Sequence, residues 1–160
     1  MAQLKRKDFA HYFDTSTTSE ANWVLEGIGV EALSLAYNPQ IDTFKQIIDD
    51  VASSTFDSYQ IQSSVSGKRI DKDDPIWEWL NDARKKAESI ETKMLEVNMA
   101  SGTGSGTLSY EALQYNVLIV INEFLGENAT ISYDVYVKGK PTVGSVTITS
   151  GKPTFTESAN

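Results

Sequence analysis

The sequence predicts a mainly β protein, a β-sandwich or partly rolled barrel of two packed antiparallel sheets with one flanking α-helix. Three observations predict this class: short runs alternate apolar and polar residues, turns that contain glycine separate them, and one segment has helical spacing. The 160 residues are the length of one domain. A compact chain of this length buries roughly 70% of the surface of its unfolded form, enough for a self-sufficient core.

The strands are predicted where apolar residues occur at every second position. Such alternation is typical of a strand with one face buried and the other in solvent. β-branched residues dominate the run Val143–Thr149, which favours a strand there as well. The alternating strands are predicted at residues 33–37, 59–65, 95–99 and 131–137.

Two β regions stand out from the others. The run Val117–Ile121 is apolar on both faces, as in a strand that is buried on both sides or meets another subunit. Residues 131–138 and 143–149 predict a hairpin whose turn contains Gly139 and Pro141. The first region has more apolar surface than one small sandwich needs.

One segment has the 3.6-residue spacing of an amphipathic helix instead. Asp74 is a typical N-cap, and Pro75 suits the first turn, where its missing N–H is not needed. Acidic residues come early and basic residues late, which complements the helix dipole. Trp77 lies beside the apolar stripe and is expected at an edge. We predict a helix over about residues 75–90 whose core face consists of Ile76, Trp79, Leu80, Ala83 and Ala87.

Two connections and both ends are expected to be irregular. Residues 38–58 form a long connection with room for a short helix or strand, and long connections in compact domains are usually functional or disordered. Residues 100–109 are rich in glycine and serine and predict a second long, flexible loop. Residues 1–20 and 151–160 are expected to be flexible ends of the single domain 1–160.

Charge and composition exclude several classes of function. The chain has 14 basic and 22 acidic side chains, so its formal net charge is −8. Binding of nucleic acids or anionic membranes requires clustered Lys and Arg, so neither is expected. The absence of cysteine excludes disulfide scaffolds, zinc ribbons and cysteine nucleophiles. No stretch reaches the roughly 20 apolar residues of a transmembrane helix.

No pattern of residues predicts an enzyme, a metal site or a cofactor. The single histidine, His11, is far in sequence from any nucleophile, so a surface or packing role is expected. The acidic residues of 71–82 lack the spacing of a calcium loop and fit a helix cap with a solvated face. The glycines of 102–106 lack the lysine of a phosphate-binding loop. Glu96 and Glu123 are more simply solvated strand residues than paired catalytic acids.

The order of the predicted parts carries a resemblance to a known family. The pieces that carry it are Trp23, Gly27–Val30, Ala32–Asp42, Asp73–Ile76, Ile131–Gly144 and Thr154–Phe155. In this order they resemble the major tail tube proteins of long-tailed bacteriophages, the siphophage type, especially those of Gram-positive hosts. The likeness spans roughly residues 20–156, and none of its pieces is catalytic in that family.

The resemblance implies a structural virion protein. Six copies would form a ring whose neighbouring sheets join into an inner barrel, and rings would stack into the tail tube through which DNA is ejected. The implied partners are other copies of the chain and the tape-measure, tail terminator and distal tail proteins. DNA would pass without specific binding. The implied location is the phage tail, after synthesis in the host bacterial cytoplasm.

An acidic lumen would suit such a tube. Six copies would carry a charge of roughly −48 before screening, and an anionic wall repels phosphate and keeps a film of water and counterions. At physiological salt the repulsion acts within a Debye length of about 8 Å. The candidate lumen acids are Glu96, Glu123 and Asp134.

The connection 38–58 is the candidate for contact between rings. Its apolar residues are unusual for a loop that stays in solvent, so we expect it to be mobile in the monomer and ordered between rings. The alternative is that these side chains cover the monomer's own core. The candidate contact residues are Asn38, Pro39, Ile41, Phe44, Ile47 and Ile48.

Two other functions stay open at this point. Another ring protein of the same apparatus, such as a tail terminator, a head-tail connector or the inner tube of a contractile device, would share the fold class. A stand-alone β-sandwich module that binds carbohydrate or a cell surface would stay monomeric and expose aromatic side chains. Its candidate aromatic residues are Trp23, Trp77, Tyr110 and Tyr115.

Overall fold

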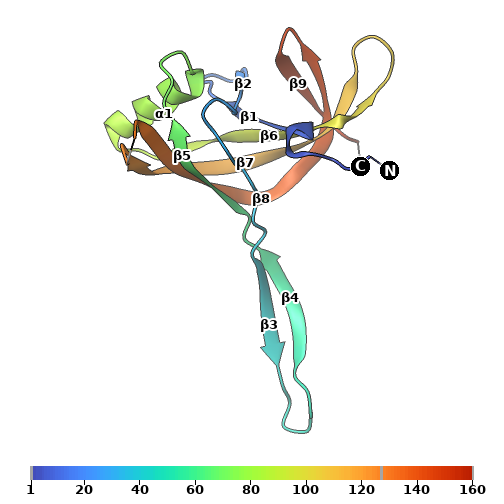
Figure 1. Cartoon of the computed structure of the whole chain (residues 1–160). Coiled ribbons are helices and arrows are strands. Elements are labelled where there is room, and N and C mark those ends of the chain that lie inside the picture. Colours follow the sequence, from blue (N-terminus) through green and yellow to red (C-terminus); the bar gives the residue numbers. More distant parts are fainter. Residues whose placement is uncertain (1, 127, 160) are drawn as a thin grey trace.

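A seven-stranded antiparallel sheet, rolled into a nearly closed barrel, forms the body of the protein (Figure 1). The computed structural model describes residues 2–126 and 128–159. The spatial order is β2-β1-β6-β7-β8-β5, and β9 also pairs with β8. The predicted class, mainly β with one flanking helix, is confirmed. The elements of the body are η1 (Arg6–Asp8), β1 (Phe9–Asp14), β2 (Trp23–Leu25), β5 (Gln62–Arg69), α1 (Pro75–Lys86), β6 (Ile90–Thr103), β7 (Ser109–Phe124), β8 (Thr130–Thr149) and β9 (Lys152–Glu157).

The three long strands β6, β7 and β8 contribute to two hydrophobic cores on opposite faces of the sheet. Successive residues of a strand point to opposite faces, and paired residues share a face. Met94, which pairs with Tyr115, lies in the first core, and the next residue, Leu95, lies in the second. The first core contains Phe13, Leu33, Val65, Ile76, Leu80, Met94, Tyr115, Val117, Ile119, Ile131, Tyr133 and Val135, and the second contains Tyr12, Trp23, Leu95, Val97, Ala112 and Val146.

Because the two cores use different faces, the apolar run on β7 is buried on one side only. Val117 and Ile119 are buried in the first core. Leu118 and Val120 point to the opposite face and are half-buried there. We call this side of β5, β7 and β8, opposite the first core, the open face.

The helix α1 covers the first core and begins where the sequence predicts. The side chain of Asp74 accepts a hydrogen bond from the backbone N–H of Ile76 at 3.0 Å, which caps the helix. Ile76 and Leu80 are fully buried. Trp79 is half-buried with its ring centre 5.9 Å from that of Phe13. These contacts confirm the predicted core face at its first two turns.

The end of α1 differs from the prediction. The helix ends at Lys86 rather than near residue 90, because Ala87 adopts the left-handed conformation (φ 53°, ψ 43°) and its N–H closes the last turn on Ala83 and Arg84. Ala87 is exposed and does not belong to the core face, and Ala83 is half-buried. Ile90 is the first residue of β6, so the apolar stripe continues into a strand.

The two ends are more regular than expected, since their backbones pair with the sheet. Within residues 1–20, β1 lies between β2 and β6 and buries Tyr12 and Phe13. Within residues 151–160, β9 pairs with β8 from Gly144 to Thr149. Residues 1 and 160 lie outside the described residues. The flexible ends expected from the sequence are therefore wrong for these two strands.

The two long loops are also shorter than predicted. β6 continues to Thr103 and β7 begins at Ser109, which leaves only residues 104–108 as the loop of the 100–109 segment. Most of residues 38–58 form a hairpin of β3 (Pro39–Phe44) and β4 (Ser53–Tyr59), a separate two-stranded sheet that projects away from the barrel (Figure 1). Backbone pairing therefore orders both segments.

A buried ion cluster joins four segments of the chain. The Lys68 ammonium on β5 lies 2.6 Å from Glu26 Oε1 and 2.8 Å from Asp74 Oδ2, and it donates to the Ile28 carbonyl at 2.6 Å. The Tyr133 hydroxyl on β8 donates to the other oxygen of Glu26. Lys68 is fully buried. Removing one partner of a buried ion pair leaves an uncompensated charge, which costs about 3–5 kcal/mol.

Lys68→Met should therefore lower the free energy of unfolding by about 3–5 kcal/mol, because two buried carboxylates lose their counterion. The matched control is Lys138→Met, whose ammonium lies 3.0 Å from Glu91 Oε1 in a pair that is more than half exposed. That change should cost less than about 1 kcal/mol. Urea unfolding followed by circular dichroism measures both, and equal small losses would contradict the role of the cluster.

Burial raises the pKa of Glu26 above its ordinary value, and the attraction of Lys68 lowers it by less. A carboxyl whose folded pKa is raised contributes stability that is present below its unfolded pKa and is lost as the pH rises through the folded pKa. Glu26→Gln removes this titration. The stability of the wild type relative to Glu26→Gln should therefore fall as the pH rises from the ordinary glutamate pKa, about 4, through the raised pKa of the folded state. Urea unfolding across this range measures it, and a constant or rising difference would contradict the assignment.

Candidate functional site

The hairpin β3–β4 and its turn, residues 39–59, form a projecting element that we call the arm. Pro39 begins β3, where a residue without an N–H is tolerated. At the base, the Gln60 N–H donates to the Tyr37 carbonyl at 3.1 Å and the Asn38 side chain donates to the Gln60 carbonyl at 3.1 Å. Asn38 has a φ of 42°, a left-handed conformation that asparagine tolerates better than most residues. These contacts set the direction in which the arm leaves the barrel.

The apolar side chains of the arm are exposed. Ile47 is fully exposed, and Ile48 and Val51 at the tip are 84% and 79% exposed. None of the arm's residues belongs to either core. The structure therefore contradicts the alternative that these side chains cover the monomer's own core. The exposed apolar residues of the arm are Ile41, Phe44, Ile47, Ile48, Val51, Phe56 and Tyr59.

Aromatic rings at the base of the arm pack on one another rather than on the barrel cores. The ring centres of Phe56 and Tyr59 are 4.7 Å apart, and Tyr37 meets Tyr59 edge to face at 5.5 Å. Such pairs contribute about 0.5–1.5 kcal/mol beyond the area they bury. The base is thus held by rings as well as by strand pairing, whereas the tip lies beyond the last strand pair, Phe44 and Ser53.

The arm is acidic as well as apolar. It contains the acids Asp42, Asp49, Asp50 and Asp57 against the single base Lys45, a net charge of −3. Asp49 Oδ2 accepts the N–H of Gln46 at 3.0 Å and closes the turn. Asp50 is exposed, and no side-chain hydrogen bond to it occurs within residues 2–126 and 128–159. The tip therefore presents aliphatic side chains beside a free carboxylate.

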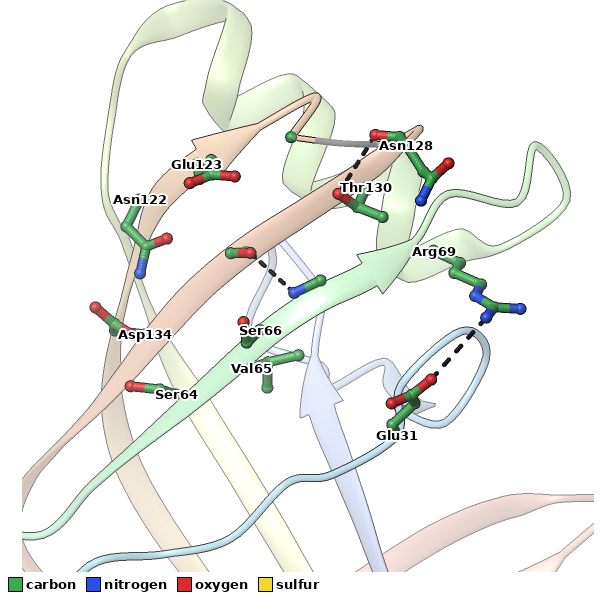
Figure 2. Close-up of a pocket in the computed structure, with 13 residues that line it drawn as sticks. Glu31, Ser64, Val65, Ser66, Arg69, Asn122, Glu123, Asn128, Thr130 and Asp134 are labelled. Atoms are coloured by element: carbon green, nitrogen blue, oxygen red, sulfur yellow. Dashed lines mark hydrogen bonds and ion pairs between the residues drawn. The ribbon is translucent and has the colours of Figure 1, made fainter.

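Two of the three candidate lumen acids share one face. Glu123 pairs with Ser132, and Asp134 pairs with Val120, which places both carboxylates on the open face. They line a hollow of about 650 Å³ between β5, β7 and β8, where Ser64 lies beside Asp134 (Figure 2). Asp134 Oδ1 is buried and has no hydrogen-bond partner among the described residues.

The surroundings of the hollow are polar. Its other lining groups include hydroxyl and amide side chains, and the ion pair of Arg69 and Glu31 at 4.0 Å lies at its rim (Figure 2). Both members of that pair are exposed, so it adds little stability. None of the described residues that line the hollow is aromatic, so they offer no platform on which a sugar could stack. The lining residues with hydroxyl or amide groups are Ser64, Ser66, Asn122, Asn128, Thr130 and Ser132.

Glu96 lies apart from these two acids. It is two residues from Met94 on β6 and so points to the face of the first core, not to the open face. Its Oε2 lies 3.4 Å from Nε2 of His11, whose Nδ1 is 3.2 Å from the Arg6 guanidinium. His11 is buried in this arrangement, in agreement with a packing role. The three acids therefore do not form one group.

The aromatic residues of the carbohydrate-binding alternative do not form an exposed patch. Trp23 is largely buried in the second core, Tyr115 is fully buried in the first, and Tyr110 packs on the second. Trp77 stacks on Phe124 with ring centres 5.9 Å apart and planes 7° from parallel, at the edge where it was predicted. The structure therefore offers no aromatic surface made of these four residues.

The acidic residues of the segment 71–82 do not gather into a metal site. In the part of the chain that the structure describes, no three side chains of His, Cys, Asp or Glu are grouped to hold a metal ion. Asp71, in the acidic segment 71–82, accepts the N–H of Asp73 at 2.9 Å, while Asp74 caps α1. Among the described helices, none is long and apolar enough to span a bilayer.

Comparisons with known proteins add no assignment. No protein-family model matches the chain, and no curated protein shows significant sequence similarity to it.

Proposed function

We propose that this protein is a self-assembling structural protein, a major tail tube protein of a long-tailed bacteriophage, whose hexameric rings stack into the conduit for DNA ejection. The observation that carries the proposal is the arm, whose exposed aliphatic tip belongs to neither core. Fully burying a side chain of this size contributes about 1.5–3 kcal/mol. Burial of Ile47, Ile48 and Val51 by a second copy therefore favours assembly by several kcal/mol per subunit.

The shape of the arm favours rings and tubes over closed dimers. It projects from the body as a single long hairpin (Figure 1). A contact between such an arm and a different surface of the next copy is heterologous. Heterologous contacts generate rings when the rotation closes and filaments when it does not. A stacked tube uses both kinds of contact.

The open face supports a conduit for DNA. Glu123 and Asp134 lie there among hydroxyl and amide groups, so a wall built from this face would repel phosphate and hold water. Glu96 points to the other face, so it would not belong to this wall. The proposed partners are the tape-measure, tail terminator and distal tail proteins, and the proposed location is the virion tail.

The alternatives differ in what supports them. A carbohydrate-binding module is less well supported, because Trp23 and Tyr115 are buried. A tail terminator, a connector or a contractile inner tube would share the fold class. Single rings would favour a terminator or connector, whereas long tubes would favour a tail tube or a contractile inner tube.

Replacing the tip residues, Ile47→Ser with Ile48→Ser, should abolish tubes or raise the concentration for assembly at least about tenfold, since the apolar contact is lost. The stability of the monomer should change by less than about 0.5 kcal/mol, because both side chains are solvated. Negative-stain electron microscopy and light scattering over a concentration series measure assembly.

The matched control is Val143→Ser, which removes a side chain that is 60% exposed on β8 rather than on the arm. It should assemble at the wild-type concentration. An arm variant that assembles as readily as the wild type would contradict the role of the arm, and a wild type that stays monomeric at every concentration would contradict self-assembly.

A further inference from the structure

A second surface of the molecule combines apolar groups with basic charge. A groove of about 520 Å³ lies between η1, β1 and the segment that follows β2. Leu33 is buried in its lining, Val30 is half-buried, and Leu25 at its side is 52% exposed. Arg6 and Lys7 of η1 also line it. The lining also contains the acids Glu26 and Glu31, of which Glu26 is buried and paired with Lys68. The groove is therefore largely apolar within and has its basic groups along the side formed by η1.

Some charged side chains of the groove are bound to neighbouring groups, and one is not. The Arg6 guanidinium donates to the Phe9 carbonyl at 2.6 Å and lies 3.2 Å from His11 Nδ1, so it helps to shape the groove. Lys7 is exposed and has no side-chain hydrogen bond to any described residue. Glu31, the exposed acid of the lining, lies 4.0 Å from Arg69. A free positive charge thus stands at the side formed by η1.

The tip of the arm has the complementary character. Its aliphatic residues Ile47, Ile48 and Val51 flank the acids Asp49 and Asp50, in a segment that lies far from η1 in the sequence and projects away from the barrel (Figure 1). Apolar area removed from water supplies the affinity of such a contact. Charges of opposite sign at its rim select the orientation.

We propose that the tip of the arm of one copy docks in this groove of a second copy. Ile48 and its aliphatic neighbours fill the apolar lining beside Leu25 and Val30, and Asp50 faces Lys7. The inference rests on the proposed self-assembly and names the surface that receives the arm. Each copy has one arm and one groove at different places on its surface, so the contact is heterologous and propagates from copy to copy.

Cross-linking between two single-cysteine variants tests the contact. The chain has no cysteine, so only the introduced thiols react. Ile48→Cys protein is mixed with a size-tagged Leu25→Cys protein under assembly conditions and treated with a short bismaleimide. The mixed dimer should form at least about tenfold more efficiently than with the control partner Thr149→Cys, which places an exposed thiol at the end of β8.

A charge exchange tests the orientation independently. Asp50→Lys should raise the concentration for assembly about two- to fivefold, the effect of one exposed ion pair. Adding Lys7→Glu to the same chain should restore assembly to near the wild-type concentration, because each copy then carries both halves of the reversed pair. Asp49 and Arg6 are left unchanged, since both hold local structure.

The outcomes separate the two proposals. Assembly with efficient Ile48-to-Leu25 cross-linking and charge rescue supports the groove as the receiving surface. Assembly without preferential cross-linking overturns this inference and leaves the tube function in place. A protein that neither assembles nor cross-links overturns both proposals together.

Discussion

The rest of the structure depends on the buried ion pairs that Lys68 makes with Glu26 and Asp74. The Lys68 ammonium has no path to solvent, so Glu26, Asp74 and the Ile28 carbonyl must stay around it. Asp74 also caps α1, so the same cluster fixes the helix that covers the first core. β5 follows the arm after only residues 60 and 61, and the cluster thereby anchors the base from which the arm projects.

The helix and the short strands are too small to cover both faces of the long strands β6, β7 and β8. The 12-residue helix and the short strands cover one face of the long strands along one half of their length and the opposite face along the other half. Two cores therefore form on opposite faces of the sheet. The uncovered part of β7 and β8 is the open face, which carries Glu123 and Asp134. The apolar side chains of the arm are likewise left exposed. The surfaces left by folding are therefore those that the proposed assembly uses.

Local signals predicted the fold class, the helix start at Asp74 and the apolar content of the arm. The helix end was not predictable, because alanine favours helices and the left-handed conformation of Ala87 follows from the return into β6. The sequence could not show to which face of the sheet Glu96 and Glu123 point. The answer depends on the presence of two cores on opposite faces and, for Glu123, on the register shift in β7 after Ile121. The burial of Lys68 left no local signal, since Glu26 is 42 residues away in the sequence.

Hydrogen exchange in the arm, residues 39–59, compared between the monomer and the assembled protein, tests the central claim most directly. Because a two-stranded hairpin without a core is only marginally stable in water, the account predicts fast exchange of these amides in the monomer and strong protection in assemblies. The amides of β7 within the first core are protected in both states. Strong protection of the arm in the isolated monomer, or equally fast exchange in the assembled protein, would contradict the claim that a second copy buries it.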